Sequence, residues 1–135
     1  MRHADGIWSW LVAAVATHFV ITLVHGAAHA AAHVGTTVLQ NIFIWAVIEV
    51  GPLAGLWVAS RFRELGGWLI AATMSASFAF GLINHFLLPG VDRVDHVSGP
   101  WSALFAVSAV ALAITEIGGA FAGMVYATRR LESSS

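Results

Sequence analysis

The sequence contains no cysteine, which excludes disulfide bonds, thiolate metal ligands, cysteine nucleophiles and a haem attached covalently through cysteines. Charged side chains are also scarce, at 10% of the 135 residues, whereas a soluble domain carries about 25%. Hydrophobic residues make up 59% of the chain and the net charge is -1, so no nucleic acid or other strongly charged partner is indicated. The shortage of charge instead indicates an integral membrane protein surrounded by a lipid bilayer.

Four apolar segments are long enough to cross a bilayer, which requires about 20 residues of helix. None of them alternates with a period of two, so helices are favoured over the strands of a barrel. The chain is therefore predicted to be all-α, with one domain of four transmembrane helices over residues 1–130 and a short tail at 131–135. The predicted spans are residues 7–33, 40–60, 66–88 and 100–128.

The arginines are distributed unevenly between the two ends of these helices. Of the six, five lie near the chain termini or in the loop at residues 61–67, and only Arg93 lies in a loop at the other end. By the positive-inside rule, both termini and residues 61–67 are predicted to be cytoplasmic. The loops near residues 34–40 and 89–99 are then predicted to lie on the outer side.

The first predicted helix carries a stripe of histidines in an otherwise apolar run, THFVITLVHGAAHAAAHVG, at His18, His25, His29 and His33. Four residues advance about 40° around a helix and seven return to within about 20°, so these side chains share one face. Lipid cannot satisfy imidazole nitrogens, so this face is predicted to point into the bundle. His25 and His29 form an HxxxH pair, whose spacing lets both bind one metal ion, although the glutamate of the HExxH motif is absent.

Ionisable residues on the other three helices can meet this stripe. Glu49 lies near the middle of the second helix, His85 just inside the outer end of the third, and Glu116 well inside the fourth. A charged carboxylate at the bilayer centre costs about 2.5 kcal/mol or more, so each should be protonated, paired or bound to a cation. At about 1.5 Å per residue, the two glutamates share a level near the midplane, and the histidines lie about one to two turns further out.

These positions predict a transition-metal site inside the bundle, nearer its outer side. Imidazole and carboxylate ligands suit Fe, Mn, Zn or Cu. Di-metal four-helix bundles combine glutamates and histidines in a comparable way, but their Glu-x-x-His motif is absent here, so no family is indicated. The predicted ligands are His25, His29, Glu49, His85 and Glu116. The residues predicted to support these ligands or to line the metal's entry are His18, His33, Asn84 and His96.

The last predicted loop contains a short acidic segment beside His96. Asp92 and Asp95 precede this histidine, with Arg93 between them. A solvated loop is the first interpretation of these charges, and a funnel through which metal enters is the alternative.

Three functions remain open at this point. Redox chemistry on a lipid-soluble small molecule such as a quinone fits a metal within the membrane, which predicts a metal-dependent membrane oxidoreductase. A b-type haem protein is the second, with His25 or His29 opposite His85 as axial ligands, but haem alone leaves the glutamates unexplained. The third is a transporter of protons or metal cations that uses a relay from His18 to His33. Four short helices would then need a homodimer to form a path.

Overall fold

The structure, a computed structural model, describes residues 2–129, and every element in that part of the chain is helical. The first and last spans are single long helices, whereas the second and third are divided into consecutive pieces. In chain order the elements are α1 (Arg2–Ala31), α2 (Val38–Phe43), the π-helix η1 (Ile44–Val50), α3 (Gly51–Ala59), α4 (Arg63–Leu82), the π-helix η2 (Ile83–Leu87) and α5 (Ser102–Thr128). The tail predicted at 131–135 lies outside the described residues.

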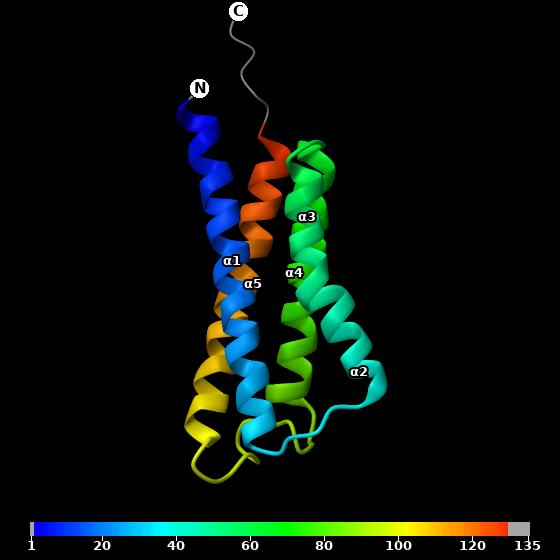
Figure 1. The fold of residues 1–135 in the computed structure, drawn as a ribbon, viewed down its shortest axis with the longest axis vertical. Helices are drawn as coiled ribbons and strands as arrows, with labels where there is room; N and C mark the ends of the chain where they lie inside the picture. Colours follow the sequence, from blue (N-terminus) through cyan, green and yellow to red (C-terminus); the bar gives the residue numbers. More distant parts are fainter. Residues whose placement is uncertain (1, 130–135) are drawn as a thin grey trace, which may run out of the picture.

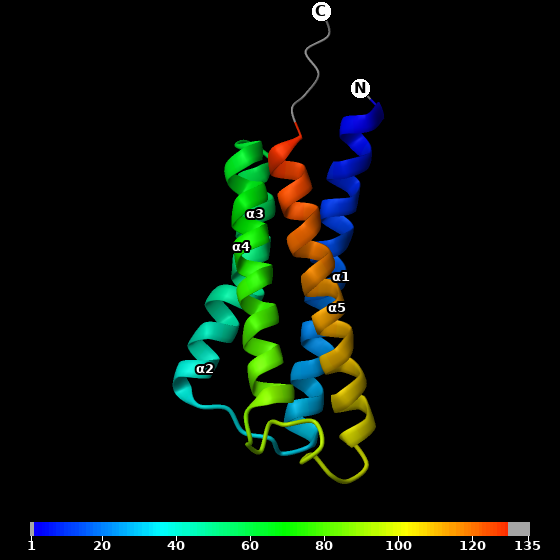
Figure 2. The same cartoon turned by 180° about the vertical axis from the view of Figure 1, so that it is seen from behind.

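Four stretches of helix are long and apolar enough to cross a membrane, which confirms the predicted number of spans. They are Gly6–Ala31, Val38–Ala59, Arg63–Leu87 and Ser102–Thr128. The start of α1, the α3–α4 turn and the end of α5 lie at one end of the bundle, and the other two loops lie at the opposite end (Figures 1 and 2). This arrangement fits a multi-pass membrane protein, and the side that faces the cytoplasm stays a prediction.

The second span changes direction where it departs from a regular α-helix. Pro52 has no amide hydrogen to donate to the Ile48 carbonyl four residues earlier, and the residues before it form the π-helix η1. The Ile48 carbonyl accepts a hydrogen bond from His18 Nε2 at 3.2 Å instead. As a result α3 packs beside α4, whereas α2 diverges from α1 (Figures 1 and 2).

The loop between α1 and α2 begins and ends with defined caps. His33 has a φ of 55°, the left-handed conformation that ends many helices, and the Val34 amide donates back to the His29 carbonyl at 3.0 Å. Thr37 and Gln40 form a capping box at the start of α2, with hydrogen bonds of 2.8 and 3.2 Å between them. The first cap turns Val34 back against α1, where its carbonyl meets the His29 side chain.

Glycines allow α3, α4 and α5 to approach to backbone contact near the end of the bundle at which α1 begins and α5 ends. A Cβ on Gly123 would lie 2.7 Å from the Gly67 carbonyl oxygen and 2.8 Å from the Ala71 amide nitrogen. A Cβ on Gly66 would overlap the backbone of Ala59. Because lipid is as apolar as the helices, close packing of small residues is a main source of helix association in a membrane.

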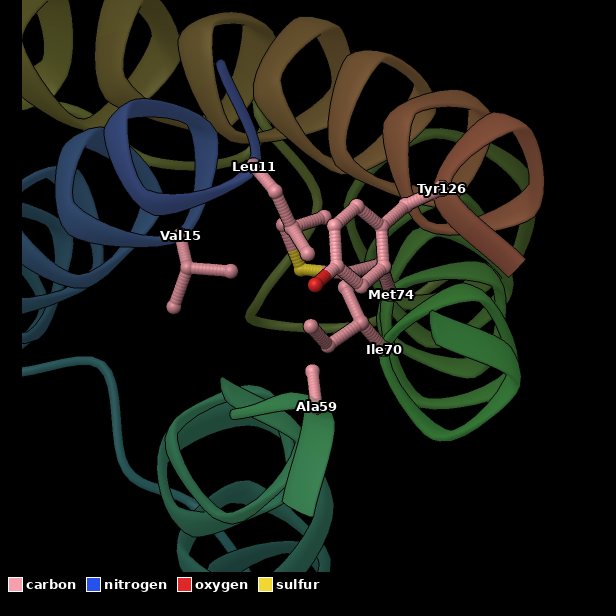
Figure 3. Close-up of a cluster of buried hydrophobic side chains, with 6 residues drawn as sticks. All are labelled: Leu11, Val15, Ala59, Ile70, Met74 and Tyr126. Carbon is pink, nitrogen blue, oxygen red and sulfur yellow. The ribbon is translucent and has the colours of Figure 1, made fainter. Parts of the chain in front are cut away.

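Apolar side chains fill the bundle beside these glycines (Figure 3). The buried members of this core come from α1, α3, α4 and α5, and they are Leu11, Val15, Ala59, Ile70, Met74 and Tyr126. Along each helix, the buried histidines and glutamates lie further than these core residues from the end at which α1 begins and α5 ends.

Replacing Gly123 with alanine is expected to destabilise the bundle by about 1–3 kcal/mol, because the new methyl group meets backbone atoms that cannot move aside. Unfolding of the purified protein by SDS, followed by circular dichroism, measures the loss. Gly118→Ala is the matched control on the same helix, because nothing lies within 4 Å of a Cβ there. Equal stability of the two variants would contradict this account of the α4–α5 contact.

Candidate metal centre

Three histidine side chains meet inside the bundle near the end at which α1 and η2 finish. His25 and His29 come from α1, and His85 comes from η2. One ring nitrogen from each lies within 4.8 Å of those of the other two, a spacing at which the group can hold one metal ion. The structure therefore brings together three of the five predicted ligands, here called the three-histidine cluster.

The three-histidine cluster rests on one aromatic side chain. Phe105 of α5 is fully buried, and its ring centroid lies 5.0 Å from that of His25, 4.7 Å from that of His29 and 5.5 Å from that of His85. The His25 ring packs edge-on against each of the other imidazoles, with centroids 4.8 Å apart in both cases. Packing from several elements thus fixes the orientations of the rings, as a preorganised ligand set requires.

Hydrogen bonds at Nδ1 identify the tautomers of His85 and His29. His85 Nδ1 lies 2.9 Å from the backbone carbonyl oxygen of Asp92, and His29 Nδ1 lies 3.3 Å from that of Val34. A carbonyl oxygen only accepts hydrogen bonds, so both Nδ1 atoms carry the proton and donate. In the neutral rings the lone pair is therefore on Nε2.

His25 reaches the same tautomer through Ser108 of α5. The Ser108 hydroxyl donates to the Leu104 carbonyl at 2.7 Å, so its oxygen accepts from His25 Nδ1, which lies 2.8 Å away. All three rings of the cluster thus hold Nδ1 in a hydrogen bond and leave the Nε2 lone pair available. Metal-binding histidines have this arrangement, in which a partner at one nitrogen orients the other toward the ion.

The Nε2 atoms of His25 and His85 face each other at 3.1 Å. Two lone pairs at this distance repel, so a cation, either a proton or a metal ion, must lie beside them. Two nitrogens that bind a tetrahedral ion at about 2.0–2.1 Å lie about 3.3 Å from each other. The observed separation is close to the one that a shared metal ion needs.

Asp92, from the loop between η2 and α5, brings a carboxylate to the cluster. Its Oδ1 lies 3.2 Å from His29 Nε2 and 3.2 Å from His85 Nδ1. Among the described side chains, this oxygen is one of three buried polar atoms without a hydrogen-bond partner. Burial alone would raise the pKa of the Asp92 carboxyl, but its contact with His85 and the positive charge that the imidazoles can carry hold that pKa below its ordinary value. An anionic oxygen therefore faces the Nε2 lone pair of His29, a second contact that a cation would stabilise.

A cavity of about 490 Å³ adjoins the cluster, and residues of all four spans line it. Small-molecule sites in proteins have volumes of about 300–1,000 Å³, so the cavity is large enough for a ligand. The three histidines and Asp92 contribute to its wall. The cluster is thus accessible from within the bundle as well as held by it.

Glu49 and Glu116, the other two predicted ligands, line this cavity and do not belong to the three-histidine cluster. Both are buried, and Glu49 Oε2 is a second polar atom without a hydrogen-bond partner among the described side chains. Glu116 Oε2 and His85 Cδ2 each lie 3.9 Å from the position of a Cβ on Gly81. Glu116 and His85 therefore both border Gly81 on the cavity wall. The role of both glutamates as ligands stays a prediction.

The four residues predicted to support the ligands or to line the entry lie apart from the cluster. His18 is buried, and its Nε2 donates to the Ile48 carbonyl of η1, which leaves Nδ1 without a partner. Asn84 accepts a hydrogen bond from Gln40 at 3.1 Å and so joins η2 to α2. His33 and His96 are exposed and line a second hollow, of about 500 Å³, beside the loops.

Three residues that hold the cluster are absent from the predicted ligand set, namely Asp92, Ser108 and Phe105. Asp95 is exposed and pairs with Arg93 at 2.8 Å, as a solvated loop requires, but Asp92 is buried, so the solvated interpretation is wrong for Asp92. The sequence contained one indication that Ser108 contributes to the site, because a polar residue within an apolar span faces the bundle interior. The sequence contained no such indication for Phe105, since aromatic residues occur along all four spans.

Comparisons of the chain with models of protein families, with curated proteins and with solved structures find no match. The function of the chain is therefore inferred from the geometry of the cluster and its cavity.

Proposed function

We propose that this protein binds a transition-metal ion within its helix bundle through the Nε2 atoms of His25, His29 and His85. The observation that carries the proposal is the pair of close contacts at these atoms. His25 Nε2 faces His85 Nε2 at 3.1 Å, and His29 Nε2 faces Asp92 Oδ1 at 3.2 Å. A single proton stabilises one of these contacts, whereas one metal ion at the centre of the cluster stabilises both.

Asp92 supplies negative charge to the site. Its backbone carbonyl fixes the tautomer of His85, and its carboxylate lies close enough to His29 for both to contact one ion. Three imidazoles and a carboxylate suit Zn²⁺, Fe²⁺, Mn²⁺ or Cu²⁺. If both termini are cytoplasmic, as the arginines predict, the ion lies toward the outer side of the membrane.

The geometry favours a metal ion over a haem between these histidines. Two axial histidines bind opposite faces of the macrocycle, so their nitrogens lie about 4 Å from each other with the ring between them. The Nε2 atoms of His25 and His85 lie 3.1 Å from each other and face directly. This separation is shorter than the one that a porphyrin between His25 and His85 requires, which supports a metal ion at this pair.

Two finer functions depend on what the bound ion does. Oxidoreductase activity on a lipid-soluble substrate such as a quinone is supported by the cavity that reaches the cluster. Transport of protons or metal cations, by a homodimer, is supported by the buried His18 that follows the stripe inward. Reconstitution in liposomes separates these predictions, because a transporter moves its ion across the bilayer and a catalytic ion stays bound.

Protein purified in detergent from cells supplied with mixed trace metals is expected to retain about one equivalent of a single transition metal per chain. Elemental mass spectrometry together with amino-acid analysis measures this ratio. The control is the same protein with His25, His29 and His85 all changed to alanine, purified in parallel. Metal at the background level of that control would contradict the proposal, and iron with a Soret band would replace it with a haem.

A further inference from the structure

The cavity beside the three-histidine cluster opens sideways between α1 and α2. The residues that it takes from α4, η2 and α5 are buried or half-buried. Its exposed lining residues all fall between residues 23 and 45, and they are Leu23, Gly26, Ala30, Gly35, Asn41 and Trp45. This is the region in which α2 diverges from α1 (Figures 1 and 2). Because the rim is made mainly by two spans, the mouth of the cavity faces lipid.

The polar groups on the cavity wall include several hydrogen-bond acceptors. Glu49 and Glu116 are buried there, and Glu49 Oε2 has no partner among the described residues. The hydroxyls of Thr22 and Ser77 are occupied, since they donate to carbonyls of their own helices at 2.9 and 2.8 Å. Within residues 2–129, no lysine or arginine lines the cavity. The wall therefore disfavours anions and favours a ligand that donates hydrogen bonds.

The remaining wall is apolar and partly aromatic. Trp45, Phe80 and Phe86 line the cavity together with aliphatic residues such as Leu112. Aromatic side chains of this kind pack favourably against another ring. An ammonium ligand would also donate hydrogen bonds, but a metal ion in the adjoining cluster would repel it. A hydroxyl group meets both conditions, because its oxygen binds the metal while its hydrogen is donated.

We propose that this cavity binds a lipid-soluble phenol or hydroquinone, which enters from the bilayer between α1 and α2. The proposal rests on the proposed metal site and names the class of molecule that reaches it. The hydroxyl oxygen takes a coordination position on the cavity side of the ion. The hydroxyl hydrogen is donated to Glu116, a buried carboxyl group that lines the cavity and borders Gly81, as His85 does. The ring and its hydrocarbon chain extend toward Trp45 at the mouth.

The test uses the detergent-purified protein loaded with Co²⁺, whose visible absorption reports changes in its ligands. The probe is 4-hexylphenol, and the matched compound is hexylbenzene, which lacks only the hydroxyl group. We expect 4-hexylphenol to change the cobalt spectrum in a saturable way and hexylbenzene to leave it unchanged. In equilibrium dialysis, the phenol is expected to bind at least about tenfold more tightly than hexylbenzene.

Two glycines provide a matched pair of variants for the route. Gly26 and Gly118 are both exposed on helices, and nothing lies within 4 Å of a Cβ at either, but only Gly26 lines the cavity. Gly26→Phe is expected to weaken binding of 4-hexylphenol by at least about tenfold without lowering cobalt content, and Gly118→Phe is expected to change neither. In Gly26→Phe the new ring can turn outward and leave the cavity open. Ala113→Phe fills the cavity from α5 and should therefore weaken binding independently of that ring.

The outcomes separate this proposal from the metal site on which it rests. Protein that binds no cobalt overturns both. Protein that binds cobalt but responds to neither compound, or equally to both, overturns the phenol site alone. Unchanged binding in both Gly26→Phe and Ala113→Phe also overturns the phenol site, because the ligand would then lie elsewhere.

Discussion

Replacing His85 with alanine is expected to lower the affinity for Zn²⁺ by at least about 100-fold. The substitution removes one of the three nitrogen ligands and leaves those of His25 and His29 in place. His85 is also the residue that links the cluster to the outer loop, through its hydrogen bond to the Asp92 carbonyl. Titration of the metal-free protein in the presence of a competing chelator measures the change. His96→Ala is the control, since His96 is an exposed histidine whose Nδ1 donates to the Gly90 carbonyl at 2.8 Å.

A loss of affinity in His85→Ala must be distinguished from a loss of fold. Circular dichroism and gel filtration of the variant report whether the bundle is intact. Added imidazole offers a second readout, because it can enter the space that the truncated side chain leaves beside the cavity and restore a nitrogen ligand. Recovery of affinity with imidazole supports direct binding by His85. An equal loss in His96→Ala, or no loss in His85→Ala, would contradict the three-histidine site.

The four spans could be predicted from hydropathy because a helix that crosses a bilayer must be apolar over most of its length. The predicted third span, residues 66–88, and the observed Arg63–Leu87 differ by only a few residues. The histidine stripe was readable as far as His29, since α1 is regular and its side chains repeat every 3.6 residues or so. The prediction that His33 shares the inward face is wrong, because α1 ends at Ala31 and His33 is exposed in the turn that follows. His25 and His29 therefore share a face in the structure as they do in the sequence pattern.

The relative depths of Glu49 and His85 were harder to predict, because a rise of about 1.5 Å per residue holds only for a regular α-helix. Each of these residues lies in a π-helix, Glu49 in η1 and His85 in η2, where the rise and rotation per residue differ from α-helical values. Pro52 was the one visible sign of such an irregularity. Single turns of π-helix occur often at functional sites, so their coincidence with the two ionisable residues agrees with a functional role.

The roles of the loop residues could not be predicted from the sequence, for a different reason. A loop has no periodicity, so the sequence around Asp92 could not indicate which of its two aspartates turns inward. The structure shows that Asp92 is buried against His29 and His85, whereas Asp95 remains exposed beside Arg93. The carboxylate nearest the cluster therefore comes from a loop, and the sequence pattern favoured the carboxylates of the helices.

Replacing Asp92 with asparagine is expected to weaken metal binding by about 10–100-fold, since the substitution removes the negative charge beside the ion while the backbone carbonyl that orients His85 remains. The affinity is measured by the same chelator competition. Asp95→Asn is the matched control, because it makes the same chemical change three residues away in the same loop, at an exposed side chain paired with Arg93. Equal losses in the two variants would mean that the overall charge of the loop, and not a contact at the cluster, attracts the ion.

The same titration on Glu49→Gln and Glu116→Gln decides how far the predicted ligand set extends. If the ion lies at the three-histidine cluster beside Asp92, Glu49→Gln should change affinity less than Asp92→Asn, because Glu49 lines the cavity but lies outside the cluster. Glu116→Gln should have an intermediate effect, since Glu116 borders Gly81 on the cavity wall together with His85. The reverse order, with the largest loss in Glu49→Gln, would place the ion deeper in the bundle and contradict a site centred on the Nε2 atoms of His25 and His85.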